Sequence, residues 1–183
     1  MMKSLFFTIL MAPLLLAAQV DSSGVQDLPL VYEGFVAHSQ GIDTNYRKMI
    51  SSFERSFGNY SDTKIIKHSS ETDSLIASSR VNFVQQDLQN KEDTRGAIRF
   101  KVRMKATENG IFYEIGEFYH SGNADSRFEP KNFGLITQST EPPRVSGISR
   151  KSRIKIWAEM KETIDVQIKE RSADFERQMA LNF

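Results

Sequence analysis

The clearest pattern in the chain is a strict alternation of apolar and basic residues between positions 98 and 105. The apolar positions are Ile98, Phe100, Val102 and Met104, and the positions between them are Arg99, Lys101, Arg103 and Lys105. A period of two is typical of a strand with one buried and one wet face. Asn109-Gly110 follows, a pair typical of a two-residue hairpin turn. We therefore predict a hairpin over residues 96–119.

The turn also predicts which residues face each other across this hairpin. If Glu108 faces Ile111, Met104 pairs with Ile115 and Phe100 with Tyr119 on the inner face. On the outer face, Lys105 then meets Glu114 and Lys101 meets Phe118.

Two segments have the three-to-four-residue period of amphipathic helices. The first is residues 42–57, with Asp43 or Thr44 as its N-cap and Gly58 after its end. The second is residues 152–179, with Ser152 as its N-cap. The predicted apolar face of the first comprises Tyr46, Met49, Ile50, Phe53 and Phe57, and that of the second Ile154, Trp157, Met160, Ile164, Ile168, Phe175 and Met179.

The remaining pattern predicts three further strands. Residues 30–38 are rich in β-formers, and residues 64–68 and 74–84 form a second hairpin with its tip at 71–73. Residues 120–150 form a long, irregular loop with room for one short strand. The predicted fold is an α+β two-layer sandwich, with an antiparallel, curved sheet of four or five strands and two helices on one face.

Residues 1–18 have the form of a secretory signal peptide. Lys3 precedes an apolar run that ends in Ala17-Ala18, and the run is too short to span a bilayer. We therefore expect an exported protein, periplasmic or secreted, with no transmembrane segment after signal removal. Residues 19–29 are expected to be a flexible lead-in, and residues 30–179 a single domain.

Charge and cysteine content exclude several classes of binding partner and of functional site. Removing residues 1–18 takes Lys3 from the 24 Lys and Arg residues, and the rest balance the 23 Asp and Glu residues. A neutral chain makes nucleic acid an unlikely partner, because nucleic-acid-binding domains usually carry a basic excess. The chain has no cysteine, so disulfides, thiolate metal sites and a cysteine nucleophile are excluded.

Several short patterns together resemble a bacterial family. They are the strand Val31-Tyr32-Glu33-Gly34-Phe35-Val36, the helix ending in Phe53 and Phe57, the Asn-Gly hairpin followed by Tyr113-Glu114-Ile115-Gly116-Glu117-Phe118, and the late helix with Trp157. The chain is similar in these respects to the family known as domain of unknown function 4468, over roughly residues 30–179. The resemblance implies exported bacterial proteins with a TATA-binding-protein-like fold, and it implies no activity, cofactor or catalytic residue.

No catalytic or metal site emerges from the residues themselves. The histidines at 38, 68 and 120 lack the short spacing of preorganised metal ligands, and we expect no metal or other cofactor. A second possible function, beside the binding function described below, is that of a hydrolase. Its active site would lie between the 120–150 loop and the sheet. It would place His120 within hydrogen-bond reach of Asp125 or Glu129.

The candidate site is the outer face of the central hairpin. Its candidate residues are Arg99, Lys101, Arg103, Lys105, Phe112 and Phe118. The basic residues would supply charge and the two aromatic residues contact area for an envelope protein or an anionic ligand. We therefore expect a non-catalytic interaction or ligand-binding module. A wet strand face that merely carries solvated Lys and Arg is the competing interpretation.

Overall fold

One antiparallel sheet organises the molecule, which was studied as a computed structural model describing residues 27–60, 62–85, 94–124 and 129–181. The predicted signal peptide lies outside these residues. The sheet order is β1-β5-β4-β3-β2, and β6 pairs with β5. The strands are β1 (Tyr32–Ala37), β2 (Lys64–Ser69), β3 (Ser74–Phe83), β4 (Gly96–Thr107), β5 (Gly110–Gly122) and β6 (Gly134–Leu135).

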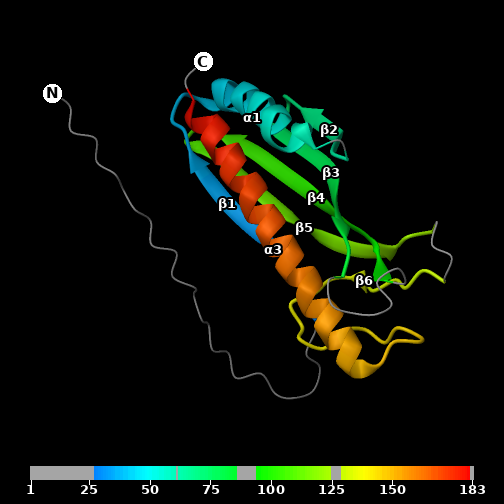
Figure 1. Ribbon diagram of the computed structural model, residues 1–183. Helices are drawn as coiled ribbons and strands as arrows, with labels where there is room; N and C mark the ends of the chain where they lie inside the picture. The colour runs from blue at the N-terminus through cyan, green and yellow to red at the C-terminus, as the bar shows by residue number, and fades with distance from the viewer. Residues whose placement is uncertain (1–26, 61, 86–93, 125–128, 182–183) are drawn as a thin grey trace, which may run out of the picture.

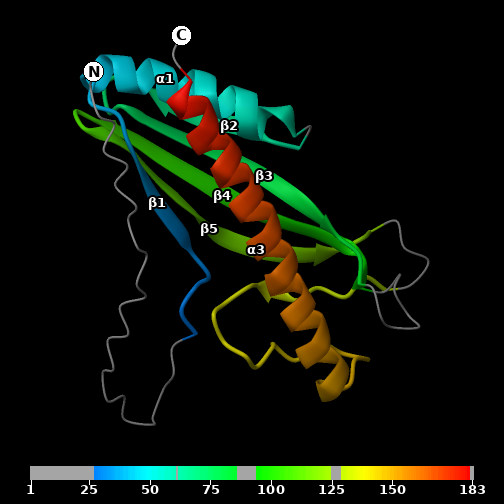
Figure 2. The ribbon, with the colours of Figure 1, turned by 60° about the vertical axis from the view of Figure 1, so that its left-hand side comes forward.

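Both long helices cover the same face of the sheet (Figures 1 and 2). They are α1 (Ile42–Ser56), followed by the short 3-10 turn η1 (Phe57–Asn59), and α3 (Arg150–Ala180). α1 packs on β4 and β5, and α3 runs across the sheet in contact with β1 and β3. The predicted two-layer α+β architecture is therefore confirmed, with the helices on one side and the opposite face of the sheet uncovered by any described element.

The core lies between the helices and the inner face of the sheet. Its largest buried side chains include Trp157, Phe53, Phe57, Phe83, Phe100, Phe118 and Phe175. The alternation in β4 orients that strand as predicted, because Ile98, Phe100, Val102 and Met104 are all buried. Trp157 also holds the irregular segment after β6, since its indole N–H donates to the carbonyl of Ser139 at 2.8 Å.

The predicted register of the central hairpin is wrong by two residues at the turn. Thr107 pairs with Gly110, so Glu108 and Asn109 form the turn, and Met104 faces Tyr113 instead of Ile115. A type I′ turn at Asn109-Gly110 would require positive φ at both of these residues. Neither Glu108 nor Asn109 has a positive φ, whereas Gly110, which follows the turn, has φ 151°. A second shift follows between Arg99 and Lys101, where β5 contains one extra residue.

The helix ends and one helix face also differ from the predictions. α1 begins after Gly41 without a side-chain cap, whereas Ser149, and not Ser152, caps α3 by accepting the backbone N–H of Ser152. The buried stripe of α3 contains Ile156 in place of the half-exposed Ile154. It also contains Arg171, which fills the gap between Ile168 and Phe175 in the predicted apolar face.

Candidate functional site

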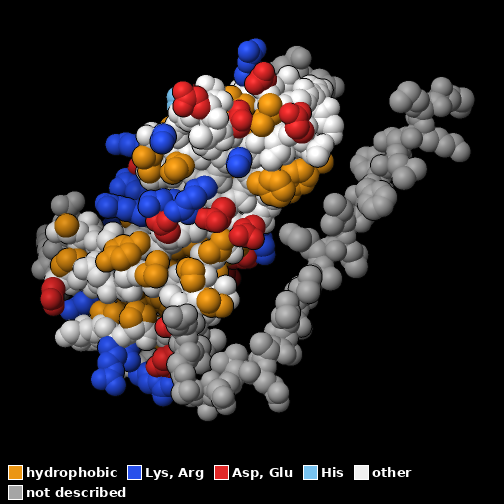
Figure 3. All heavy atoms as spheres, turned by 180° about the vertical axis from the view of Figure 1, so that it is seen from behind, with side chains coloured by type: hydrophobic (Ala, Val, Ile, Leu, Met, Phe, Trp, Pro, Cys, Tyr) orange, Lys and Arg blue, Asp and Glu red, His pale blue; other side chains and the backbone are white. Residues whose placement is uncertain are grey.

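The open face of the sheet carries the basic residues of β4, as the alternation predicts. Arg99 and Lys105 are exposed, and Lys101 and Arg103 are half-buried. Lys and Arg side chains form a band across this face, with acidic and hydrophobic side chains beside it (Figure 3). The face is therefore mixed in charge and not uniformly cationic.

Two of the four basic side chains are neutralised by β5. Lys101 Nζ lies 2.6 Å from a Glu117 carboxylate oxygen, and Arg103 pairs with Glu114 at 2.6 Å and also with Glu117. These contacts, first with Lys101 and then with Arg103, lower the pKa of the Glu117 carboxyl. Lys101 and Arg103 thus have partners within the chain.

Arg99 and Lys105 differ from these two. Within the described part of the chain neither has an ion-pair partner, and they lie at opposite ends of β4. Lys105 faces Phe112 on β5 and not Glu114, because the hairpin register is shifted. The charge that remains available to a ligand is therefore at the two ends of the strand.

Phe118 was expected on this open face, and that expectation is wrong. The side chain is fully buried in the core, with its ring 5.5 Å from Phe100 and 5.8 Å from Tyr32. The extra residue in β5 is the cause, since Glu117 adopts φ 56° and reverses which residues point inward after it. Phe118 is a core residue and is removed from the candidate site.

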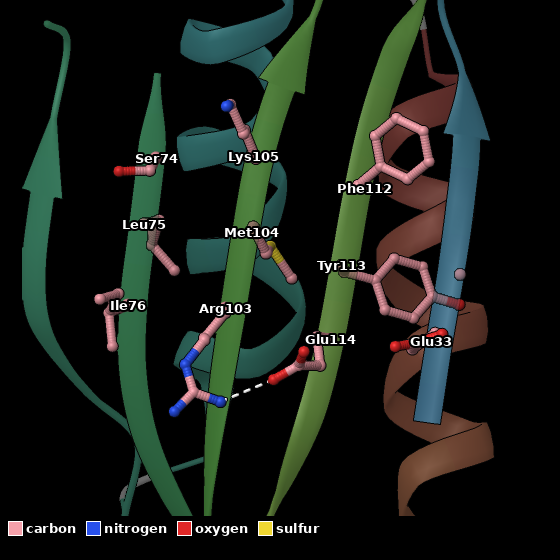
Figure 4. A pocket seen from close by; sticks show the side chains of 11 residues that line it. Glu33, Ser74, Leu75, Ile76, Arg103, Met104, Lys105, Phe112, Tyr113 and Glu114 are labelled. Carbon is pink, nitrogen blue, oxygen red and sulfur yellow. Dashed lines mark hydrogen bonds and ion pairs between the residues drawn. The ribbon is translucent and has the colours of Figure 1, made fainter. Parts of the chain in front are cut away.

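A hollow of about 470 Å³ lies on the open face near the turn of the central hairpin. Figure 4 shows its lining side chains, which include Ile76 from β3, Arg103 and Lys105 from β4, Phe112 from β5 and Glu33 from β1. Arg103 points toward Glu114, while Lys105 and Phe112 lie at the other end (Figure 4). The volume falls within the range of small-ligand pockets, so the hollow can accept an aromatic or branched apolar side chain.

An exposed aromatic pair lies next to the hollow. The rings of Phe35 and Phe112 are 4.5 Å apart, and the two residues are 45% and 54% exposed. They are directly opposite each other in the register of β1 and β5. Aromatic residues, phenylalanine among them, are enriched in protein interfaces relative to the rest of the protein surface.

The hydrolase alternative gains no support from the described residues. His120 is fully buried, with its ring between those of Phe83 and Phe133, and burial lowers its pKa to about 4. The Glu129 carboxylate pairs with Lys131 at 2.9 Å. The other predicted partner, Asp125, lies outside the described residues.

The remaining histidines take part in local contacts. His38 Nδ1 lies 2.6 Å from the Asn45 side-chain oxygen, and His68 Nδ1 lies 3.2 Å from the Tyr46 hydroxyl. Within residues 27–60, 62–85, 94–124 and 129–181, no group of three or more His, Asp or Glu side chains is placed to hold a metal ion.

Sequence analysis missed part of the hollow. Glu33 and Ile76 come from strands that the sheet order brings to either side of the central hairpin, and their neighbours are apolar or small. No local pattern singles them out. It also missed Glu117, whose outward orientation depends on the bulge.

Comparison with known proteins identifies the family and the fold. Residues 32–121 match the model of a family described as a domain of unknown function (DUF4468) with TBP-like fold. The chain carries a DUF4468 domain. The matched residues run from the start of β1 almost to the end of β5, and therefore include every described residue that lines the hollow.

A solved structure supports the same fold for the DUF4468 chain. A TBP-like protein from Parabacteroides distasonis has a TM-score of 0.53 at 11% identity, covering 80% of this chain and 92% of that one. A DUF4468 family protein from Bacteroides ovatus has a TM-score of 0.46 at 11% identity, covering 86% and 93%. No curated protein matches the chain. The first likeness shows a TBP-like fold and carries no function at this identity.

None of the described helices is both long and apolar enough to cross a membrane. The 31-residue α3 has the length but carries charged residues along most of its exposed surface.

Proposed function

We propose that this DUF4468 chain is an exported bacterial envelope protein that binds a partner protein on its open sheet face and catalyses no reaction. The partner inserts an apolar or aromatic side chain between Ile76 and Phe112 and places a neighbouring carboxylate on Lys105. The single observation that carries the proposal is the hollow of about 470 Å³ beside the exposed Phe35–Phe112 pair.

Charge decides which part of the face would bind. Lys101 and Arg103 already have carboxylate partners, so an incoming anion would have to compete with Glu114 and Glu117. Lys105 has no such partner among the described residues, and it lines the hollow together with Phe112. A carboxylate on Lys105 would therefore add an ion pair where the apolar contact is made. Of the predicted binding residues, Lys105 and Phe112 are the two that we assign to direct contact.

Export is the second part of the proposal, and it rests on the signal-like residues 1–18. Cell fractionation of the full chain tests it. We expect the processed protein outside the cytoplasm, and a variant that begins at residue 19 to remain in the cytoplasm. Equal distribution of the two forms would contradict export.

A fluorescent probe tests the hollow directly. 8-Anilinonaphthalene-1-sulfonate combines an aromatic body with an anion, the chemistry that Phe112 and Lys105 would recognise. We expect the folded protein to bind it, and the double variant Phe112→Ser, Lys105→Ser to lose this binding. The matched control is Tyr119→Ser, Arg99→Ser, because it removes one half-exposed aromatic and one cation elsewhere in the sheet. Equal binding by both double variants would contradict the assignment.

The same two double variants test the partner interaction. After crosslinking in the envelope fraction, we expect one component to be captured by the natural chain and by the control, but not by the hollow variant. Circular dichroism and thermal unfolding check that both variants fold. Capture that does not depend on Phe112 and Lys105 would overturn the proposed function.

A further inference from the structure

Beyond Ser78, strand β3 pairs with no described residue on the side away from β4. β2 pairs with β3 only as far as Ser78, which faces Lys64, and β3 continues past that end (Figures 1 and 2). The carbonyl of Arg80 accepts a hydrogen bond from Arg171 Nη2 at 3.3 Å, so it points away from β4. Residues two apart in a strand direct their backbone groups to the same side. The N–H and C=O of Asn82 therefore face the same open edge.

Helix α3 passes beside this end of β3, and a groove lies between the two elements. Thr163, Gln167 and Arg171 are four residues apart, so they lie on one side of the helix. Two hollows of about 310 and 360 Å³ share Thr163 and Gln167. The first is lined by Arg80, Val81 and Asn82, and the second by Phe83 and Val84. Each hollow is lined by consecutive residues of this segment, and the side chains of consecutive strand residues face opposite sides of the sheet. Both hollows therefore lie at the edge of β3 and not over one of its faces.

One end of the groove holds an excess of positive charge. Arg171 is 2% exposed, with its guanidinium 3.8 Å from the centroid of the Tyr60 ring. It donates to Ser79 Oγ at 2.7 Å, and its Nε has no hydrogen-bond partner within the described part of the chain. The one carboxylate lining this hollow, Asp62, already pairs with Arg80 at 2.8 Å. Two guanidinium groups thus lie near one carboxylate among the described residues, and Arg171 itself is held by neutral groups and not by an acid. A buried cation without a carboxylate partner is costly.

The other end of the groove differs in character. Val84 and Val166 line the second hollow and are 44% and 56% exposed. The carboxylates of Glu159 and Glu162 line it as well. The groove therefore runs from a cationic end, past an open strand edge, to an apolar and acidic end.

We propose that this groove binds the carboxyl-terminal segment of a partner polypeptide as an added strand. The terminal carboxylate lies at Arg171 and Arg80, and backbone hydrogen bonds form with Asn82. An apolar side chain packs between Val84 and Val166, and a basic residue further from the terminus faces Glu162. Because β3 runs from Arg80 toward Val84, the bound segment runs antiparallel to it. Strand addition to an exposed sheet edge is an established mode of peptide recognition.

The site is separate from the hollow on the open face. It lies at the edge of β3 and against α3, whereas the open-face hollow lies near the turn of the central hairpin on the side without helices. The two sites share no lining residue. The proposal therefore goes beyond the proposed function and can fail or hold independently of it.

Fluorescence anisotropy with defined peptides tests the groove. The probe is a pool of fluorescein-labelled pentapeptides of the pattern Lys-Xaa-Val-Xaa-Val with a free terminal carboxylate, and the control is the same pool with a terminal amide. We expect the free-acid pool to bind at least about tenfold more tightly than the amide pool. Equal binding of the two pools, or binding of neither up to about 1 mM, would overturn the proposal.

Two substitutions locate the binding on β3. Asn82→Pro removes the N–H that faces the groove and leaves the hydrogen bonds to β4 in place, because proline is tolerated where a strand's N–H points to an open edge. We expect it to weaken binding about tenfold or more, whereas the matched variant Asn82→Ala keeps the N–H and binds like the natural chain. If the two variants bind equally, the added-strand geometry is wrong.

The carboxylate contact has its own test. Arg171→Met keeps most of the side-chain volume and removes the charge, so we expect the preference for free acid over amide to disappear. If this variant does not fold, Arg80→Gln at the exposed rim is expected to reduce the same preference. The variant Phe112→Ser, Lys105→Ser on the open face should retain full peptide binding. An unchanged acid preference in a folded Arg171→Met variant would show that Arg171 serves only the core.

Discussion

The carboxylate of Glu117 lies 2.6 Å from Lys101 Nζ on the open face, although strict alternation along β5 would point Glu117 into the core. Ile111 and Ile115 are buried before the bulge, and Phe118 and His120 are buried after it. The extra residue thus changes which residues of β5 face the core, from the odd-numbered positions before it to the even-numbered positions after it. A single left-handed residue both completes the core with Phe118 and supplies the acid that neutralises Lys101 and Arg103.

Glu117→Val should destabilise the protein. A β-branched residue adopts φ 56° only at a cost, and a β5 that kept its length but lost the bulge would point Phe118 to solvent and Tyr119 into the core. We expect a loss of about 1–3 kcal/mol in the free energy of unfolding, the usual cost of such a strained backbone. Urea unfolding measures it. The control Glu117→Gly keeps the extra residue and adopts φ 56° easily, so its free energy should change by less than about 1 kcal/mol. Similar losses for both variants would contradict this role of the bulge.

Gly34 is required by the ring of Tyr113. The two residues are directly opposite in the register of β1 and β5, and a Cβ added at Gly34 would lie 2.2 Å from Tyr113 Cζ. Gly34→Ala should therefore cost about 1–3 kcal/mol in unfolding free energy, as overpacking does. Adding Tyr113→Leu should recover part of that loss, because the smaller side chain leaves room for the Cβ. A double variant no more stable than Gly34→Ala would show that the ring is not the obstacle.

The period of hydrophobic residues predicted the inner face of β4, the buried face of α1 and most of the buried face of α3, because burial of one face imposes that period directly. The period could not predict the bulge, because nothing in the order of apolar and polar residues indicates that Glu117 adopts a left-handed backbone conformation. The predicted register of the hairpin was wrong because the backbone conformation of the turn also differs from the one that the sequence favours. Asn109-Gly110 favours a turn centred on those two residues, and the chain instead places Glu108 and Asn109 at the turn.

The candidate site was predictable only where it lies on one hairpin. Lys105 and Phe112 are found by alternation, but Glu33 and Ile76 reach the hollow through the order of strands in the sheet. Arg171 lies outside the predicted apolar face of α3, in the gap between Ile168 and Phe175. Its burial depends on Tyr60 and Ser79, which are distant in sequence, so a helical period cannot reveal it.

Asn45 should be the most sensitive polar residue of α1. Its fully buried side-chain amide donates to the carbonyls of His38 and Thr107 at 2.6 and 2.7 Å, joining the helix to the end of β1 and to the central hairpin. Asn45→Leu would leave these carbonyls without their donor, so we expect a loss of about 2–4 kcal/mol in unfolding free energy. The matched control is Thr44→Leu on the exposed side, which should change it by less than about 0.5 kcal/mol. Chemical unfolding of both variants checks the difference, and equal effects would contradict it.

His120 should make the stability of the protein depend on pH below neutrality. Burial between Phe83 and Phe133 lowers the pKa of the imidazole from 6.5 to about 4, so the folded state holds it neutral. The unfolded chain binds a proton at the ordinary pKa of 6.5, and stability therefore falls as pH falls from 6.5 toward 4. We expect a loss of roughly 2 kcal/mol between neutral pH and about pH 5, measured by urea unfolding.

A second variant separates this effect from that of the carboxylates. The pKa of Glu117 lies below 4.5, so its titration affects stability only at lower pH. His120→Asn carries no titratable group, and its unfolding free energy should be nearly constant between neutral pH and about pH 5, whatever its absolute value. If the natural chain and His120→Asn lose the same stability over this interval, a group other than the buried imidazole takes up the proton.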